Sequence, residues 1–238
     1  MSYLSKVTQH LKELDECSEV HEVSRQVAER LMDGGIIHLF GCGHSSLLAQ
    51  DAYYRAGGLA PVRPILIEPL MLHQGAFQST WNERTEGFVY PYLAKEDIRE
   101  EDIVIVFSTS GRNPAPIDVA LFGKAQKAMV ISVQSLEYNS SQSSKHPSGK
   151  RLESVVDVVL DTKVPVGDAV EKREGMDTSF SPISSVVGTA LLHELMTNVI
   201  EAFWEAGKVA PVFKSGNVDG ADQHNRAMIE QYKDRITF

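Results

Sequence analysis

The chain has 238 residues, of which 42% are hydrophobic and 23% charged, a balance typical of a protein that folds around a core. Its 32 Asp and Glu residues outnumber its 23 Lys and Arg residues, which gives a formal net charge of −9. A negative field over the whole molecule argues against a surface that binds nucleic acid or anionic membranes. Any anionic ligand must therefore be held by local groups.

The cysteine content and the N-terminus favour a cytoplasmic protein. Two cysteines, Cys17 and Cys42, are too few for a disulfide framework or a cysteine-rich zinc site. The N-terminus lacks the apolar core of a signal peptide, and the longest apolar stretch, residues 186–204, is interrupted by polar side chains. We therefore expect no membrane association.

The first third of the chain alternates helical and extended patterns. Apolar residues at spacings of three and four predict two helices within residues 3–33. Residues 36–40 predict a buried strand, and a glycine-rich turn then leads into a helix over residues 47–56. A second strand is predicted at residues 64–68. Residues 70–95 show little periodicity and indicate a loop-rich insert.

The same alternation continues to the C-terminal part. It predicts an α/β fold: a three-layer, doubly wound, mainly parallel sheet, preceded by N-terminal helices. We expect one domain over residues 1–238, in which residues 1–33 are N-terminal helices, residues 34–206 are the core, and residues 207–238 are a tail and helix. The remaining predicted elements are strands at residues 103–107, 128–133 and 155–161, helices at 115–127 and 184–206, and a final helix.

Two loops rich in glycine and serine follow predicted strands, at residues 41–46 and 108–113. In open α/β sheets ligands collect at the carboxyl ends of strands, where helix N-termini offer unpaired N–H groups suited to phosphate. The second loop therefore predicts a phosphate site, although a serine-rich turn that only caps a helix is the alternative. The first loop is neither G-x-G-x-x-G nor a P-loop, so a nucleotide site is not favoured.

Taken together, the two loops resemble a known family. Phe-Gly-Cys-Gly-His-Ser at residues 40–45 and Phe-Ser-Thr-Ser-Gly-Arg-Asn at residues 107–113 resemble the SIS (sugar isomerase) domain of phosphosugar-binding proteins, over about residues 20–206. Further stretches, such as His146-Pro-Ser-Gly-Lys and Gly167-Asp-Ala, extend the likeness to a bacterial family of stand-alone SIS proteins almost end to end. The positions that the resemblance assigns to phosphosugar binding are Gly43, Ser45, Ser46, Ser108, Thr109, Ser110, Gly111 and Asn113.

The resemblance implies a flavodoxin-like sheet, a sugar-phosphate ligand and a homodimer or homotetramer. It does not name the reaction, because SIS domains also serve as etherases, deaminating synthases and regulatory sensors. The phosphoheptose isomerases are similar in size, and two pairs of their site residues correspond here to Asp51 and Arg55, and to Ser185 and His193. Three of those four chemical groups differ, so we expect no metal and no other cofactor.

An aldose–ketose isomerase needs a base that moves a proton between adjacent carbons, and donors that stabilise an enediolate. The candidates near the loops are His44, Glu83, Glu86 and His193. The alternatives are solvated loop carboxylates for the two glutamates and a core histidine for His193. We expect His10, His21 and His146 to be exposed.

The sequence thus favours a sugar-phosphate isomerase similar to the phosphoheptose isomerases. Two alternatives remain: a non-catalytic sugar-phosphate sensor, and a lyase or etherase acting on an amino-sugar phosphate. The absence of a basic helix-turn-helix extension argues against a DNA-binding regulator, so we expect no nucleic-acid partner.

Overall fold

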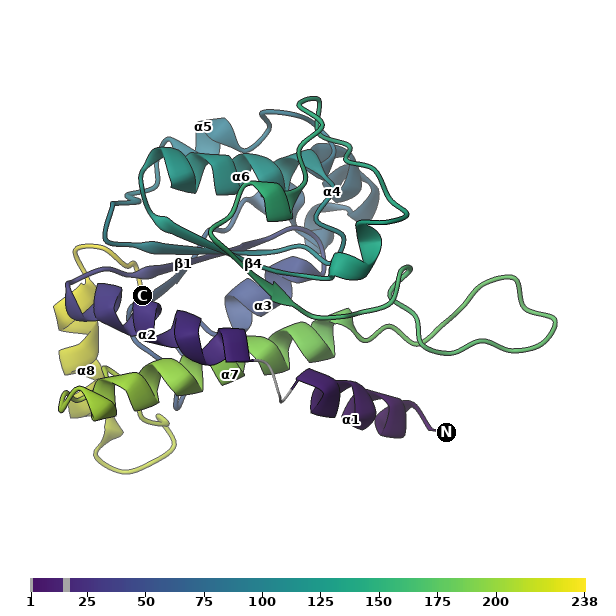
Figure 1. The fold of residues 1–238 in the computed structure, drawn as a ribbon. Coiled ribbons are helices and arrows are strands. Elements are labelled where there is room, and N and C mark those ends of the chain that lie inside the picture. Colours follow the sequence, from purple (N-terminus) through teal and green to yellow (C-terminus); the bar gives the residue numbers. More distant parts are fainter. Residues whose placement is uncertain (1, 15–17) are drawn as a thin grey trace.

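A parallel sheet forms the centre of the molecule in the computed structural model, which describes residues 2–14 and 18–238 (Figure 1). Within those residues five strands lie in the order β2-β1-β3-β4-β5, all parallel. This confirms the predicted three-layer, doubly wound α/β fold. Cys17 lies outside the described residues. The strands are β1 (Ile37–Gly41), β2 (Val62–Pro64), β3 (Ile103–Phe107), β4 (Met129–Gln134) and β5 (Val158–Asp161).

Helices cover both faces of the sheet, and its central strand β3 is accordingly apolar throughout. Alternate residues of β3 point to opposite faces. The helices on one face are α2 (Ser18–Met32), α3 (Ser45–Asp51) and α7 (Ser184–Glu205), and those on the other are α4 (Ala76–Glu83), α5 (Tyr90–Leu93) and α6 (Pro114–Ala125). Ile103, Ile105 and Phe107 pack in the cluster that includes α2, α3 and α7, while Val104 and Val106 pack in the cluster that includes α6.

Two helices lie outside these layers. Helix α1 (Tyr3–Leu14) packs Val7 and Leu14 against Val164, Ile183 and Val187. Helix α8 (Ala221–Tyr232) lies near the C-terminus, at the opposite end of the molecule from α1 (Figure 1). No helix among the described residues is both long enough and apolar enough to cross a bilayer.

The strand predicted at residues 64–68 is displaced. Strand β2 ends at Pro64, and Ile65 and Ile67 are buried beyond the sheet instead. The insert at residues 70–95 is also more regular than expected, because it contains α4 and α5. These helices are too short to show a helical period. Single-turn 3₁₀ helices lie at Glu68–Leu70, Leu72–Gln74, Leu136–Tyr138 and Leu152–Ser154.

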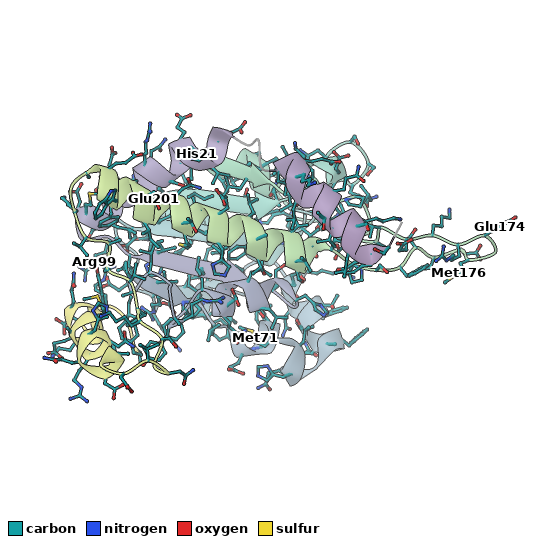
Figure 2. The ribbon with its side chains drawn as sticks, turned by 90° about the horizontal axis from the view of Figure 1, so that it is seen from below. His21, Met71, Arg99, Glu174, Met176 and Glu201 are labelled. Atoms are coloured by element: carbon teal, nitrogen blue, oxygen red, sulfur yellow. The ribbon has the colours of Figure 1, made fainter. Side chains whose placement is uncertain are left out.

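Residues 165–183 form an arm that projects from the body of the molecule (Figure 1). Its two sides are joined by hydrogen bonds between Glu171 and Phe180. Figure 2 shows Glu174 and Met176 at the far end of this arm. The base of the arm, in contrast, returns to the sheet and helps to form the site described next.

Candidate functional site

A cavity of about 500 Å³ opens at the carboxyl end of the sheet. The strand order reverses between β1 and β3, and ligands of doubly wound proteins bind at such a reversal. Both glycine- and serine-rich loops reach it. The lining consists of residues 42–45 and 108–110, with Leu72, Ser79, Thr80, Glu83, Tyr138, Gly167, Asp168, Pro182, Ser184 and Ser185.

The first loop turns sharply from β1 into α3. A Cβ atom at Gly41 would collide with the carbonyl oxygen of Ser45, so only glycine allows the helix to begin this close to the strand. The side chains of His44 and Ser45 line the cavity and make no hydrogen bond to another described residue, and Gly43 contributes its backbone. Ser46 is buried, and its hydroxyl donates to the carbonyl oxygen of Gly43 at 2.8 Å. Ser46 therefore supports the loop without lining the cavity.

The second loop offers unpaired donors to the same cavity. The amides and hydroxyls of Thr109 and Ser110 have no hydrogen-bond partner among residues 2–14 and 18–238, whereas the amide of Ser108 donates to Val133. Gly111 has φ +60°, and a Cβ atom there would lie 2.7 Å from Oε1 of Gln134. Gly111 thus shapes the turn from outside the lining. Unpaired N–H and O–H groups at the end of a strand suit an anionic oxygen ligand.

Glu83 lies at the end of α4 and brings a carboxyl group into the cavity. Nδ2 of Asn113 donates a hydrogen bond to its Oε1 at 2.8 Å. Burial raises the pKa of Glu83, and this effect exceeds the opposing effects of Asn113 and of the charges on Arg84 and Lys145. Asn113 therefore contacts a candidate catalytic carboxyl group and does not line the cavity.

The base of the arm and the start of α7 also line the cavity. The Asp168 carboxylate accepts hydrogen bonds from the amides of Ile183 (3.1 Å) and Ser184 (2.7 Å) and from the Ser184 hydroxyl (2.6 Å). Sequence reasoning missed Asp168, Ser184 and Tyr138 as lining residues. The available signal was the Gly167-Asp-Ala stretch, whose position in space could not be known before the chain was folded.

Two candidates lie outside this lining. Glu86 is exposed on a separate surface with Phe88 and Tyr92. Nε2 of His193 lies 2.6 Å from Oδ2 of Asp51, which also pairs with Arg55 at 2.5 Å. The structure thus joins three of the four positions that correspond to phosphoheptose isomerase residues, but in an ion-paired cluster outside the cavity lining.

The other histidines differ in their surroundings. His146 is buried, contrary to expectation, because its ring pairs with the buried Asp118. His10 is half-buried, where Nε2 lies 2.7 Å from the carbonyl oxygen of Thr162, and His21 is exposed as expected. Within the described part of the chain no three His, Cys, Asp or Glu side chains converge as a metal site.

Comparisons with known sequences agree with the geometry. The sequence matches the SIS domain family over residues 2–135. It is 47% identical over 236 residues to the UPF0309 protein of Geobacillus thermodenitrificans, covering 98% of this chain and 95% of that protein. It is also 47% identical over 222 residues to a UPF0309 protein of Listeria innocua, covering 93% of this chain and 90% of that protein.

Solved structures with the same fold include two phosphoheptose isomerases. The enzyme from Neisseria gonorrhoeae aligns with a TM-score of 0.54 at 15% identity, over 82% of this chain and 94% of that one. The enzyme from Francisella tularensis aligns with a TM-score of 0.55 at 13% identity, over 83% and 94%. At such low identity the likeness concerns the fold alone.

Proposed function

The chain belongs to the SIS domain family and, within it, to the UPF0309 proteins, and we propose that it binds a sugar phosphate and interconverts its aldose and ketose forms. One observation carries this proposal. The unpaired donors of residues 108–110 and the Glu83 carboxyl group open into one cavity at the β1/β3 reversal.

In this proposal the second loop holds the phosphate. The amides and hydroxyls of Thr109 and Ser110 donate to its oxygens, with Ser108 beside them. Hydrogen bonds to a charged group contribute about 1.5–3 kcal/mol each, which suits an acidic protein that must hold a dianion locally. Ser45 and the backbone of Gly43 line the same cavity and are the groups proposed to contact the sugar.

Glu83 is the proposed proton carrier. Its carboxylate takes the proton from C2 of the aldose, the electron pair moves into an enediolate, and the carboxyl group, whose proton can exchange with solvent, delivers a proton to C1 to give the ketose. The hydroxyl proton must move between O2 and O1, and His44 is the group proposed to relay it. A raised pKa suits Glu83 because the group must act first as base and then as acid near neutral pH.

The decisive experiment follows deuterium from solvent into C1 of ketose phosphates and into C2 of the aldose phosphates formed from them. Glu83→Gln should lower the exchange rate by about 10²- to 10⁴-fold, the usual contribution of a general base. Glu86→Gln is the matched control and should retain exchange, because Glu86 lies outside the cavity lining. Equal exchange in wild type and Glu83→Gln would remove Glu83 from the mechanism.

The same experiment separates the alternatives. Binding of sugar phosphates without any exchange in the wild type would favour the sensor, while exchange accompanied by loss of a substituent would favour the lyase or etherase. We also propose that the chain assembles as a homodimer or homotetramer, which sedimentation equilibrium would measure.

A further inference from the structure

Every carbonyl oxygen of residues 108–111, called the phosphate loop below, accepts a hydrogen bond from a residue that does not line the cavity. The donors are the amide of Gly111 to Ser108 (3.2 Å), the amide of Ser135 to Thr109 (3.0 Å), Nη2 of Arg151 to Ser110 (2.6 Å) and the amide of Leu152 to Gly111 (2.9 Å). The oxygens of the loop are thus engaged by other parts of the protein, while the amides of Thr109 and Ser110 stay unpaired within the described chain.

This division of donors and acceptors is what an anion site requires. A carbonyl oxygen carries a partial negative charge and repels an anion, whereas an N–H group attracts it. Of the four groups that hold the oxygens, three are backbone amides and one is a side chain, that of Arg151. A substitution at Arg151 therefore releases one carbonyl oxygen and leaves the other three bonds in place.

The guanidinium group of Arg151 is itself fixed by several bonds. Its side chain is only 13% exposed. Nε donates to Oε1 of Glu153 at 2.6 Å, Nη1 donates to the carbonyl oxygen of Gln142, and Nη2 also donates to Oδ1 of Asn139 at 3.0 Å. All three nitrogens are engaged. A lysine cannot reproduce this arrangement, because its donors lie on a single nitrogen.

Glu153 makes the role of Arg151 geometric. Its carboxylate pairs with the guanidinium group, so the two charges largely cancel at the loop. The other oxygen of Glu153, Oε2, accepts from Nε2 of Gln134 on β4 at 2.9 Å. A Cβ atom at Gly111 would lie 3.2 Å from this Oε2. The pair therefore packs directly against the phosphate loop and is anchored to the sheet.

We propose that the guanidinium group of Arg151 is a positioning group for phosphate binding. It holds the carbonyl oxygen of Ser110 outside the cavity, so that the amides of Thr109 and Ser110 alone face the anion. Arg151 does not line the cavity and does not touch the ligand. This inference rests on the proposed sugar-phosphate function, because it assumes that the loop binds phosphate.

Titration with inorganic phosphate, followed by the backbone amide NMR signals of Thr109 and Ser110, tests the proposal without assuming a sugar. The variant Arg151→Met/Glu153→Gln keeps an unbranched side chain and leaves no unpaired carboxylate behind. It should bind phosphate at least about 10-fold more weakly than the wild type. Glu153→Gln is the matched control. It removes the ion pair but retains the bond from Arg151 to Ser110, so it should bind phosphate like the wild type.

The nitrogen chemical shift of Gly111 gives a second readout, which a general loss of stability does not change. This nitrogen shares a peptide unit with the Ser110 carbonyl, so its signal reports the hydrogen bond that the carbonyl accepts. The signal should move in Arg151→Met/Glu153→Gln and keep its position in Glu153→Gln.

Arg151→Lys answers the question if the double variant does not fold. It retains the positive charge beside Glu153 but not the planar set of donors, and it should weaken phosphate binding about 3- to 10-fold. Wild-type affinity in Arg151→Lys would refute the role of the guanidinium group.

The outcomes distinguish this inference from the proposed function. If phosphate shifts the amide signals of Thr109 and Ser110 in the wild type and binds the double variant equally well, the phosphate site stands and the role of Arg151 is refuted. An equal loss in Glu153→Gln would refute it too, because that loss would follow the ion pair. If phosphate shifts neither amide signal in the wild type, the phosphate site fails and this inference fails with it.

Discussion

At the scale of single residues, environment separates groups that look equivalent along the chain. Glu83 and Glu86 are three positions apart in the same insert, yet only Glu83 lines the cavity. Helix α4 ends at Glu83, so the backbone changes direction before Glu86. In a continuous helix, a spacing of three residues would place both carboxylates on the same face. Because the helix ends between them, the two carboxylates point to different surfaces.

Ser110 tests the phosphate assignment. Ser110→Ala should weaken binding of a sugar phosphate about 10- to 100-fold, because it removes one hydrogen bond to a charged group, and should barely change binding of the unphosphorylated sugar. Calorimetry with both ligands measures this difference. Ser141→Ala, an exposed serine of the loop that carries Lys145, should affect neither ligand. Equal losses for both ligands would contradict the assignment.

Glu83 also links function to stability. Its folded-state pKa is raised above the unfolded value, so the folded state binds the proton more tightly. Stability is therefore greatest below the unfolded pKa and falls as pH rises through the folded pKa. Glu83→Gln should raise the melting temperature near pH 8, and this gain should disappear near pH 4. Thermal unfolding across that range would show it, and a gain independent of pH would refute the explanation.

At the scale of elements, the path from β1 into α3 depends on one glycine. The close contact between Gly41 and the backbone of Ser45 leaves no room for a side chain. Gly41→Ala must move the start of α3, and with it Ser45 and His44 in the cavity wall.

We expect Gly41→Ala to destabilise the protein by about 1–3 kcal/mol, as overpacking does, and to weaken sugar-phosphate binding. Urea unfolding and calorimetry would measure the two effects. Gly216→Ala is the control, since no atom lies within 4 Å of its added Cβ and its φ is not positive. Wild-type stability in Gly41→Ala would show that the turn can relax.

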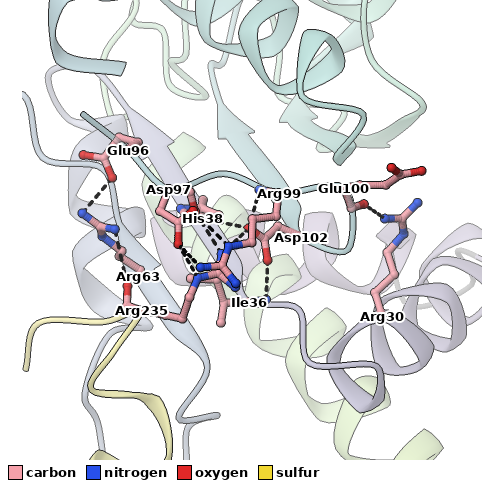
Figure 3. A network of polar contacts seen from close by, with 10 residues as sticks. All are labelled: Arg30, Ile36, His38, Arg63, Glu96, Asp97, Arg99, Glu100, Asp102 and Arg235. Carbon is pink, nitrogen blue, oxygen red and sulfur yellow. Dashed lines mark hydrogen bonds and ion pairs between the residues drawn. The ribbon is translucent and has the colours of Figure 1, made fainter. Parts of the chain in front are cut away.

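At the scale of the whole molecule, a buried network holds the amino ends of the strands and the C-terminal segment together (Figure 3). The Asp102 carboxylate accepts hydrogen bonds from His38 (3.2 Å) and Arg235 (2.7 Å) and from the amides of Ile36 (2.9 Å) and Arg99 (2.8 Å). Burial opposes ionisation of Asp102, but these partners outweigh it, so its pKa is lowered.

Asp102→Asn should destabilise the protein by about 3–5 kcal/mol at neutral pH, because it leaves buried donors and Arg235 without their charged partner. A lowered folded-state pKa contributes stability above the unfolded pKa that is lost as pH falls through the folded pKa. The difference between wild type and variant should therefore shrink below about pH 4 in urea unfolding. Asp219→Asn, in the exposed tail, should match the wild type throughout.

The local patterns of apolar and polar residues were sufficient to predict the architecture. The strand at residues 103–107 was predicted with its observed bounds, and the alternation of strands and helices predicted the parallel sheet. Both predictions depend only on residues close together in the chain, because the spacing of apolar residues determines whether a segment forms a strand or a helix. The glycine and serine content of short segments likewise identified the two loops that follow β1 and β3 as candidate binding loops.

Tertiary structure decided which side chains share the cavity. Asp168 reaches it from the base of the arm, and Glu83 turns toward Asn113. His146 is buried because its ring pairs with the buried Asp118, 28 positions earlier. Contacts between distant segments depend on how helices and loops pack over the sheet, and no periodicity within either segment encodes that packing. The family resemblance supplied the class of ligand, while only the folded chain separated Glu83 from Glu86.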